Sequence, residues 1–212
     1  MTKITTVLFD FDGVIANTEP QYDIYIDALG ERYNLGIKNF AMQVKGTTTP
    51  DILKRHFSHL SKEEQQKIAK ELIDFELQMD FPLVDGIIDF INYLKDNGYR
   101  VGLVTSSQDT KMKRALEIIH LSGAFDTEVT AARITDGKPN PMCYLLAAED
   151  LNVSPSECVV FEDSYHGINA GKNAGMRVVG VSTTIPAEKL KDITDYVTPD
   201  FSDLPQVIRY IS

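Results

Sequence analysis

The sequence predicts an α/β protein built on a doubly wound parallel sheet, with a helical subdomain inserted into it. Short runs of apolar and β-branched residues recur along the chain, and a helix-like segment follows each of them. Runs with so few polar positions indicate strands that are buried on both faces. The expected strands are residues 4–9, 100–104, 158–161 and 177–181. Alternation of strands and helices favours a parallel order in the sheet.

Helices are expected between these strands, at residues 84–97, 111–119 and 142–151. In the first of them, Ile87, Ile91 and Leu94 recur at the spacing of one helix face, and Gly98 follows as a stop signal. Each helix therefore has an apolar side that can cover the sheet.

One region interrupts the alternation. Residues 17–81 contain no convincing strand, and a helix is expected at 61–79, where Ser61 and Glu64 have the spacing of a capping box. Connections in α/β units are normally short, so a stretch of about 65 residues indicates an inserted all-helical cap. The predicted domains are a core of residues 1–16 and 82–212 and a cap of residues 17–81.

Composition and charge limit the possible partners. The 212 residues are 43% hydrophobic and carry a net charge of −10, with no basic face for nucleic acid and no attraction to anionic membranes. Cys143 and Cys158 lie in no metal-binding pattern. Residues 1–13 do not resemble a signal peptide, and no apolar run reaches the length of a membrane span. We expect a cytoplasmic protein, by default a monomer, that attracts any anionic substrate only locally.

Acidic side chains follow two of the expected strands. Asp10 and Asp12, separated by one residue and followed by Gly13, end the first strand, and Glu162 and Asp163 end the strand at 158–161. Ligand sites in open α/β sheets lie beyond the carboxyl ends of the strands. Adjacent acids at a buried strand end are costly unless they are paired or bound to a cation, and Mg²⁺ prefers such ligands. A polar turn and a solvated helix start are the alternatives for the two clusters.

Two further polar clusters follow the same logic. Thr105 and Ser106 end the strand at 100–104, where a hydroxyl and free backbone N–H groups can bind a phosphate oxygen. Lys138, between Gly137 and Pro139, can direct its ammonium group at a phosphate. Taken alone, the first is more often a helix N-cap and the second a surface turn. The combination of acids, hydroxyls and one lysine at successive strand ends indicates a phosphate-handling site.

In these four motifs the chain resembles the haloacid dehalogenase superfamily. The motifs occur in that family's order: DFDGVIANTEP from Asp10, VTSS from Val104, GKPNP from Gly137 and FEDSYHGINAGKNAGM from Phe161. The resemblance runs from about residue 4 to residue 182. The first and last motifs are similar to those of the β-phosphoglucomutase-like and sugar-phosphatase branch, which has a Rossmann-like core and a helical cap after the first strand.

The resemblance implies a role for each motif residue. Asp10 would be the nucleophile that forms an aspartyl-phosphate, and Asp12 would be the general acid and base, with its backbone carbonyl on Mg²⁺. The other expected roles are phosphoryl binding by Thr105 and Ser106, charge neutralisation by Lys138, and Mg²⁺ binding by Asp163, with Glu162 as a direct or indirect partner. The implied substrate is a small phosphorylated metabolite.

Two departures from the branch bear on the reaction. Tyr22 occupies the position of a histidine in true β-phosphoglucomutases, and Lys45-Gly46 is followed by threonines, beginning with Thr47, where those enzymes carry an arginine for the second phosphate. We therefore expect a phosphatase that acts on a small phosphorylated sugar or sugar alcohol, with Tyr22, Lys45, Gly46 and Thr47 meeting the substrate. A sugar phosphomutase is the alternative, because Lys45 could partly replace the arginine.

Two other classes of protein share some of these features. A response-regulator receiver domain also carries acids, a hydroxyl and a lysine at strand ends, but such domains are only about 120 residues long and have no helical insertion. A catalytically inactive relative would act as a phospho-binding module, yet every motif residue is present here. Both remain distant alternatives to an enzyme.

Overall fold

The computed structural model describes residues 3–212, and its core is a six-stranded sheet in which all strands are parallel. The order across the sheet is β3-β2-β1-β4-β5-β6. The strands are β1 Thr6–Phe9, β2 Arg100–Val104, β3 Thr127–Val129, β4 Cys158–Glu162, β5 Arg177–Val181 and β6 Tyr196–Thr198. β1 is central, with Val7 opposite Val101 on one side and Val159 on the other. The predicted doubly wound fold is confirmed.

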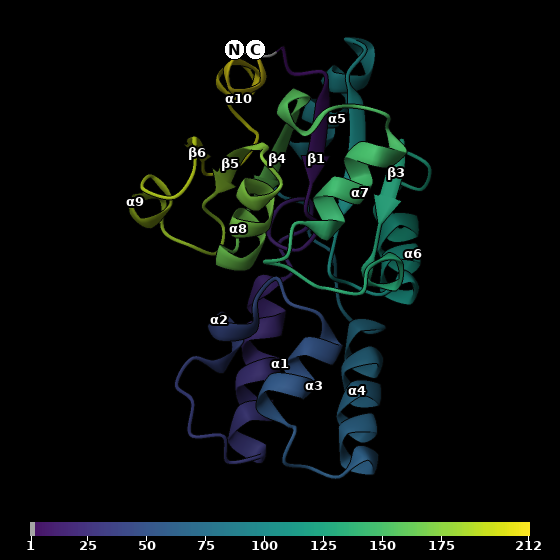
Figure 1. Cartoon of the computed structure of the whole chain (residues 1–212), viewed down its shortest axis with the longest axis vertical. Helices are drawn as coiled ribbons and strands as arrows, with labels where there is room; N and C mark the ends of the chain where they lie inside the picture. Colours follow the sequence, from purple (N-terminus) through teal and green to yellow (C-terminus); the bar gives the residue numbers. More distant parts are fainter. Residues whose placement is uncertain (1–2) are drawn as a thin grey trace.

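Helices cover both faces of the sheet (Figure 1). They are α5 Ile87–Asp96, α6 Asp109–Ile118, α7 Met142–Asp150, α8 Tyr165–Asn173, α9 Ala187–Leu190 and α10 Leu204–Ile211, with 3₁₀ turns at Ala131–Arg133 and Pro155–Glu157. Val7 and Phe9 of β1 face α5, α6 and α10, whereas Leu8 faces α7, α8 and α9. This follows from the alternation of side chains along a strand, which requires an apolar cover on each face.

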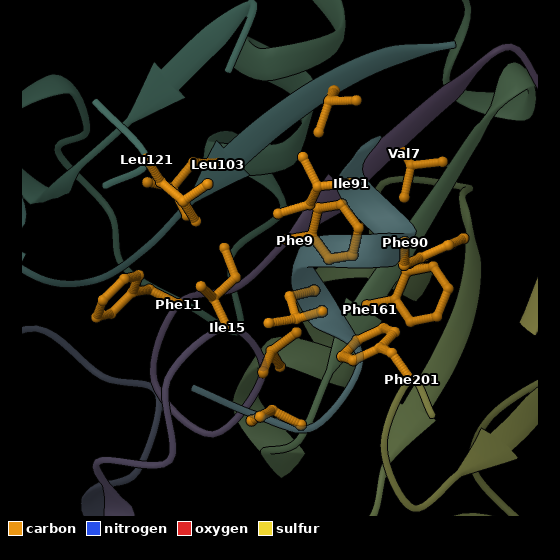
Figure 2. Packing of buried hydrophobic residues seen from close by; sticks show 14 of the residues in the cluster. Val7, Phe9, Phe11, Ile15, Phe90, Ile91, Leu103, Leu121, Phe161 and Phe201 are labelled. Atoms are coloured by element: carbon orange, nitrogen blue, oxygen red, sulfur yellow. The ribbon is translucent and has the colours of Figure 1, made fainter. Parts of the chain in front are cut away.

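Four phenylalanines form the centre of the core on the α5 side (Figure 2). The ring of Phe9 lies 5.3 Å from that of Phe161 and 5.8 Å from that of Phe90, and Phe201 stacks on Phe90 at 5.5 Å. All four side chains are fully buried. Burial of each contributes roughly 1.5–3 kcal/mol, so the strand ends that carry the polar motifs rest on a rigid base.

The inserted region consists of helices packed on one another rather than on the sheet (Figure 1). They are α1 Glu19–Arg32, α2 Phe40–Val44, α3 Thr49–His56 and α4 Lys62–Glu76. Their own apolar core contains Ile26, Phe40, Phe57 and Leu72. The predicted capping box is present, because Ser61 and Glu64 bond each other's backbone at the start of α4. This region is consistent with an inserted cap.

Two connections join the cap to the core, and they lie side by side. Ala16 forms an antiparallel bridge with Leu83, and the backbone N–H of Asn17 donates to the carbonyl of Pro82 at 2.7 Å. The helices α1–α4 fall inside the predicted limits 17–81, which remain a prediction, and residues 1–2 of the predicted core lie outside the described residues. Within residues 3–212, no helix has both the length and the apolar character to cross a membrane.

Candidate active site

The polar motifs meet at the edge of the sheet that faces the cap. Parallel strands end at one edge, which places Asp10 after β1, Thr105 after β2 and Asp163 after β4. The ladder continues to the site itself: the N–H of Asp10 donates to the carbonyl of Phe161 at 3.1 Å. One cavity between core and cap is lined by Asp10, Asp12, Thr105 and Asp163 together with cap residues. The predicted convergence of these motifs is therefore seen in the structure.

Lys138 joins the acids of two strands. Its Nζ lies 2.9 Å from Oδ1 of Asp10 and 2.6 Å from Oε1 of Glu162, and all three side chains are buried. Burial raises the pKa of Asp10 to about 7, although Lys138 acts in the opposite direction. Burial alone would lower the pKa of Lys138, but the two carboxylates outweigh it and raise that pKa. The lysine is thus a fixed positive charge beside Asp10.

Glu162 has no exposed surface, and each of its oxygens is bonded. Oε1 accepts from Lys138 and from the hydroxyl of Tyr144 at 2.8 Å. Oε2 accepts from the hydroxyl of Ser164 at 3.1 Å and from two backbone N–H groups. Gly167 makes room for it, since a Cβ there would lie 1.7 Å from Oε1. This arrangement suits Glu162 to orienting Lys138. Because its oxygens are already bonded, it would influence a metal indirectly, through the residues that it contacts.

Carboxylate oxygens of Asp10, Glu162 and Asp163 lie within 4.8 Å of one another, and all three residues are buried. Burial and the neighbouring acids raise the pKa of Asp163 well above its usual range. A divalent cation would relieve this concentration of like charge, and hard oxygen donors are the ligands of Mg²⁺. Gly13 allows the close approach, because a Cβ there would lie 2.0 Å from Oδ2 of Asp163. The residues present fit a divalent metal.

Asp12 lies in the same cavity but has different partners. Nζ of Lys111 is 2.6 Å from both of its oxygens, Ser107 donates to it at 3.0 Å, and Thr18 donates from the start of the cap. Lys111 is fully buried. Ser107 lies just before the start of α6 and Lys111 lies in its first turn, and their polar atoms are 2.9 Å apart.

Thr18, Ser107, Lys111 and Tyr144 are site residues that the sequence reasoning missed. A lysine in a helix-like stretch normally indicates a solvated face, and only its spacing from Ser107 hinted at another position. Tyr144 lies in a short apolar helix and gave no signal of its own. Thr18 and Ser107 lie within the motifs that begin at Asp10 and Val104, but no role was assigned to them there, and all four residues hold the predicted acids in place.

The predicted phosphate-binding hydroxyls face the cap. The Thr105 side chain is buried and accepts a hydrogen bond from the N–H of Ser107 at 3.1 Å. Ser106 donates to the carbonyl of Gly46 at 2.9 Å, which joins the core loop directly to the cap. A second junction is the contact of 3.0 Å between Nδ1 of His166 and the carbonyl of Lys45. Phosphate binding by Thr105 and Ser106 remains a prediction.

The four predicted cap residues, Tyr22, Lys45, Gly46 and Thr47, all line the cavity. The hydroxyl of Tyr22 donates to Oε1 of Glu76 at 2.7 Å. Lys45 is not free: it forms ion pairs with Glu19 and, at 2.6 Å, with Asp23. The cap therefore contributes acids to the cavity that the sequence reasoning did not identify.

Known proteins similar to this chain belong to a family of hydrolases. Residues 7–181 match the model of the haloacid dehalogenase-like hydrolase family, and the chain belongs to that family. It is 30% identical over 195 residues to a phosphorylated carbohydrates phosphatase of Thermotoga maritima, covering 82% of this chain and 84% of the relative. It is 29% identical over 220 residues to the pyrophosphatase PpaX of Bacillus mycoides, covering 99% of each.

The fold has close structural counterparts. A β-phosphoglucomutase of Clostridium difficile superposes with a TM-score of 0.81 at 24% identity, covering 98% of this chain and 97% of that one. At this identity the likeness supports the fold. Together with the buried acidic triad of Asp10, Glu162 and Asp163, the family match makes this chain a phosphatase-type hydrolase of the haloacid dehalogenase class.

Proposed function

We propose that this protein is a Mg²⁺-dependent phosphatase that hydrolyses a small phosphorylated sugar or sugar alcohol through an aspartyl-phosphate at Asp10. One observation carries the proposal: Asp10 and Asp12 line the same cavity with separate cationic partners, Lys138 and Lys111. The two acids are thereby suited to different tasks. Phosphoryl transfer depends mainly on positioning and charge neutralisation, which this arrangement supplies.

In the first half-reaction, a carboxylate oxygen of Asp10 attacks the phosphorus of the bound monoester. The bond between phosphorus and the ester oxygen breaks, and Asp12 donates a proton to the departing oxygen. Lys138, beside Asp10, offsets the negative charge that the incoming phosphoryl group brings. Thr105 and Ser106 orient the phosphoryl oxygens. The products of this step are the free alcohol and phosphorylated Asp10.

In the second half-reaction, Asp12 accepts a proton from a water molecule as the water oxygen attacks the phosphorus. The bond between phosphorus and Asp10 breaks, inorganic phosphate leaves, and both aspartates return to their starting states. Lys111, Ser107 and Thr18 hold Asp12 in one orientation throughout. The same group therefore serves first as acid and then as base, because the proton that it loses in the first half-reaction is regained in the second.

Asp10, Asp163 and the backbone carbonyl of Asp12 are the proposed ligands of Mg²⁺, with Glu162 acting through its neighbours. When bound, the ion supplies charge neutralisation between the nucleophile and the phosphoryl oxygens. Within the chain itself, Thr184 donates to Asp163 and Lys138 to Glu162, so each acid is held in place by a second residue. Such support keeps ligand geometry fixed.

Two observations favour a carbohydrate leaving group. The cap offers hydroxyls and carboxylates at the cavity, which match sugar hydroxyls, and a relative 30% identical is named as a phosphatase of phosphorylated carbohydrates. Pyrophosphate is the second candidate, because another relative is the pyrophosphatase PpaX. A sugar phosphomutase remains the third candidate. It would need a cation in the cap for the second phosphate, and Thr49 stands at the position where the resemblance to β-phosphoglucomutases implies an arginine.

The test is release of inorganic phosphate from a panel that contains p-nitrophenyl phosphate, hexose and hexitol phosphates, pyrophosphate, and β-glucose 1-phosphate with glucose 1,6-bisphosphate. We expect hydrolysis of sugar phosphates with Mg²⁺ and none in EDTA. Formation of glucose 6-phosphate without phosphate release would establish the mutase instead. Full hydrolysis by Asp10→Asn would overturn the proposed nucleophile.

A further inference from the structure

The cavity between core and cap is strongly acidic. The charged side chains that line it are five acids and one lysine: Asp10, Asp12, Glu19, Glu76, Asp163 and Lys45. Glu19, Glu76 and Lys45 come from the cap, and the other three come from the core. Since the core acids are engaged in the proposed chemistry, the cap residues decide which leaving group can be accommodated.

Lys45 is already neutralised. It pairs with both Glu19 and Asp23, and only 6% of its side chain is exposed. Burial alone would lower the pKa of Lys45, but the two carboxylates more than compensate and raise it. A charge held between two acids is not available to a second phosphate unless those pairs are broken.

The other two lysines near the site are also engaged. Lys111 is bound to Asp12, and Lys138 is bound to Asp10 and Glu162, and both are buried behind the acids that line the cavity. They serve the reacting phosphoryl group. Within the described residues, no cation that lines the cap side of the cavity lacks an acidic partner.

Glu76 adds a further acceptor on the cap side. It is 7% exposed, and its Oε1 accepts the hydrogen bond of Tyr22. Burial raises the pKa of Glu76 and of Glu19 above that of an exposed glutamate, which favours the protonated over the ionised state of each group. In both states they offer oxygen atoms to a donor and no positive charge to an anion.

The remainder of the cap side is mixed in character. Besides Tyr22 and Gly46, the cap side contributes two threonines, Thr47 and Thr49, and the apolar set Ile26, Ala41, Val44, Ile52 and Leu72. A polyol can present its hydroxyls to the polar residues of the cap side and its C–H surfaces to the apolar residues. A carboxylate or a second phosphate would find neither a free cation nor a surplus of donors.

We infer that the leaving group of the substrate carries hydroxyl or amino donors and no anionic group besides the transferred phosphoryl. This inference rests on the proposed phosphatase function and narrows it. A cavity of this kind favours monophosphates of polyols, sugars and amino sugars, and it disfavours bisphosphates, phosphorylated acids and pyrophosphate. The discrimination comes from repulsion of the wrong partner as well as attraction of the right one.

The experiment compares kcat/KM for compounds of similar size with different leaving-group charge. Glucitol 6-phosphate and 6-phosphogluconate share a six-carbon chain and differ in one terminal group, and glucosamine 6-phosphate carries an ammonium group. We expect the neutral and cationic compounds to exceed 6-phosphogluconate by about tenfold or more. Mg²⁺-dependent hydrolysis of p-nitrophenyl phosphate is measured in parallel as the check on the proposed function.

A matched pair of variants links the preference to the cap. Glu76→Gln removes one acid at the cavity and should reduce the ratio of glucitol 6-phosphate to 6-phosphogluconate severalfold, whereas Glu63→Gln, exposed on the same helix, should leave it unchanged. Hydrolysis of p-nitrophenyl phosphate with equal rates on neutral and anionic sugar phosphates would overturn the inference alone. Absence of all Mg²⁺-dependent hydrolysis would overturn the proposed function.

Discussion

The Nζ of Lys111 lies 2.6 Å from both carboxylate oxygens of Asp12. The lysine has no exposed surface, and it also lies 4.8 Å from the ring centre of Tyr22. One buried cation therefore fixes the orientation of the proposed acid and base and contacts the cap. An ion pair of this kind has a large effect when one partner alone is removed, because the other charge is left buried.

Lys111→Met should lower the free energy of unfolding by about 3 kcal/mol, because Asp12 keeps only hydroxyl partners. Adding Asp12→Asn should recover part of this loss, since the unpaired charge is then removed. Urea unfolding measures both variants, with Lys113→Met, exposed on the same helix, as the control. If Lys111→Met unfolds like the control, the ion pair does not contribute to stability.

The two aspartates should respond differently to amidation. Asp10→Asn removes the nucleophile and should abolish hydrolysis of every substrate. Asp12→Asn removes proton transfer, which typically contributes 10²–10⁴-fold. Its loss should be larger for a sugar phosphate than for p-nitrophenyl phosphate, whose leaving group needs little protonation. Equal losses on both substrates would show that Asp12 is not the acid.

Metal-free protein should become more stable as the pH falls from 8 to about 6. Burial raises the pKa of Asp10 to about 7 and that of Asp163 as well, so the folded state binds protons that the unfolded chain, with aspartate pKa values about 3.9, does not. Mg²⁺ should substitute for those protons and raise Tm more at pH 8 than at pH 6. Thermal scans in EDTA and in Mg²⁺ at both pH values provide the measurement; a Tm that Mg²⁺ leaves unchanged would contradict it.

Gly167→Ala should reduce kcat by about 10²-fold, because displacement of a catalytic group by about 1 Å is sufficient for such a loss. The added Cβ would lie 1.7 Å from Oε1 of Glu162, the atom that binds Lys138. Asn169→Ala, exposed on the same helix, is the matched control. Steady-state kinetics of the two variants tests the role of Glu162 in holding Lys138. Unchanged kcat in Gly167→Ala would mean that the position of Glu162 is not critical.

Most of the sheet could be predicted from sequence because its central strands are uniformly apolar. The strands at 100–104 and 177–181 begin and end where they were expected, whereas the first begins at Thr6 rather than Ile4. β3 and β6 were missed, because three residues are too few for a periodic signal and their edge positions relax the apolar requirement. The capping box at Ser61 was a local signal and was confirmed.

The acids at the strand ends could be placed in the site from sequence. The residues that form ion pairs or hydrogen bonds with the site residues from distant parts of the chain could not. Asp10, Asp12 and Asp163 end strands, and strand ends converge in any parallel sheet. The pairing of Lys45 with Glu19 depends on how the loop after α2 folds against α1, over a separation of 26 residues. No local pattern encodes that contact, and it changes the expected role of Lys45 as a possible anion-binding group.

The last prediction concerns Thr49, which lines the cavity at the start of α3. Thr49→Arg would add a second cation to a cavity whose lining lysine, Lys45, is already paired with two acids. The cost to the helix is about 0.3–1 kcal/mol, because a cation at a helix N-terminus opposes its dipole. Hydrolysis of glucose 1,6-bisphosphate relative to glucitol 6-phosphate should then rise by about tenfold. Thr49→Met is the matched control, because it adds similar length without charge. The measurement is kcat/KM for both substrates in both variants. A rise in both variants would assign the effect to shape, and a rise in neither would show that the cap side of the cavity does not contact the leaving group.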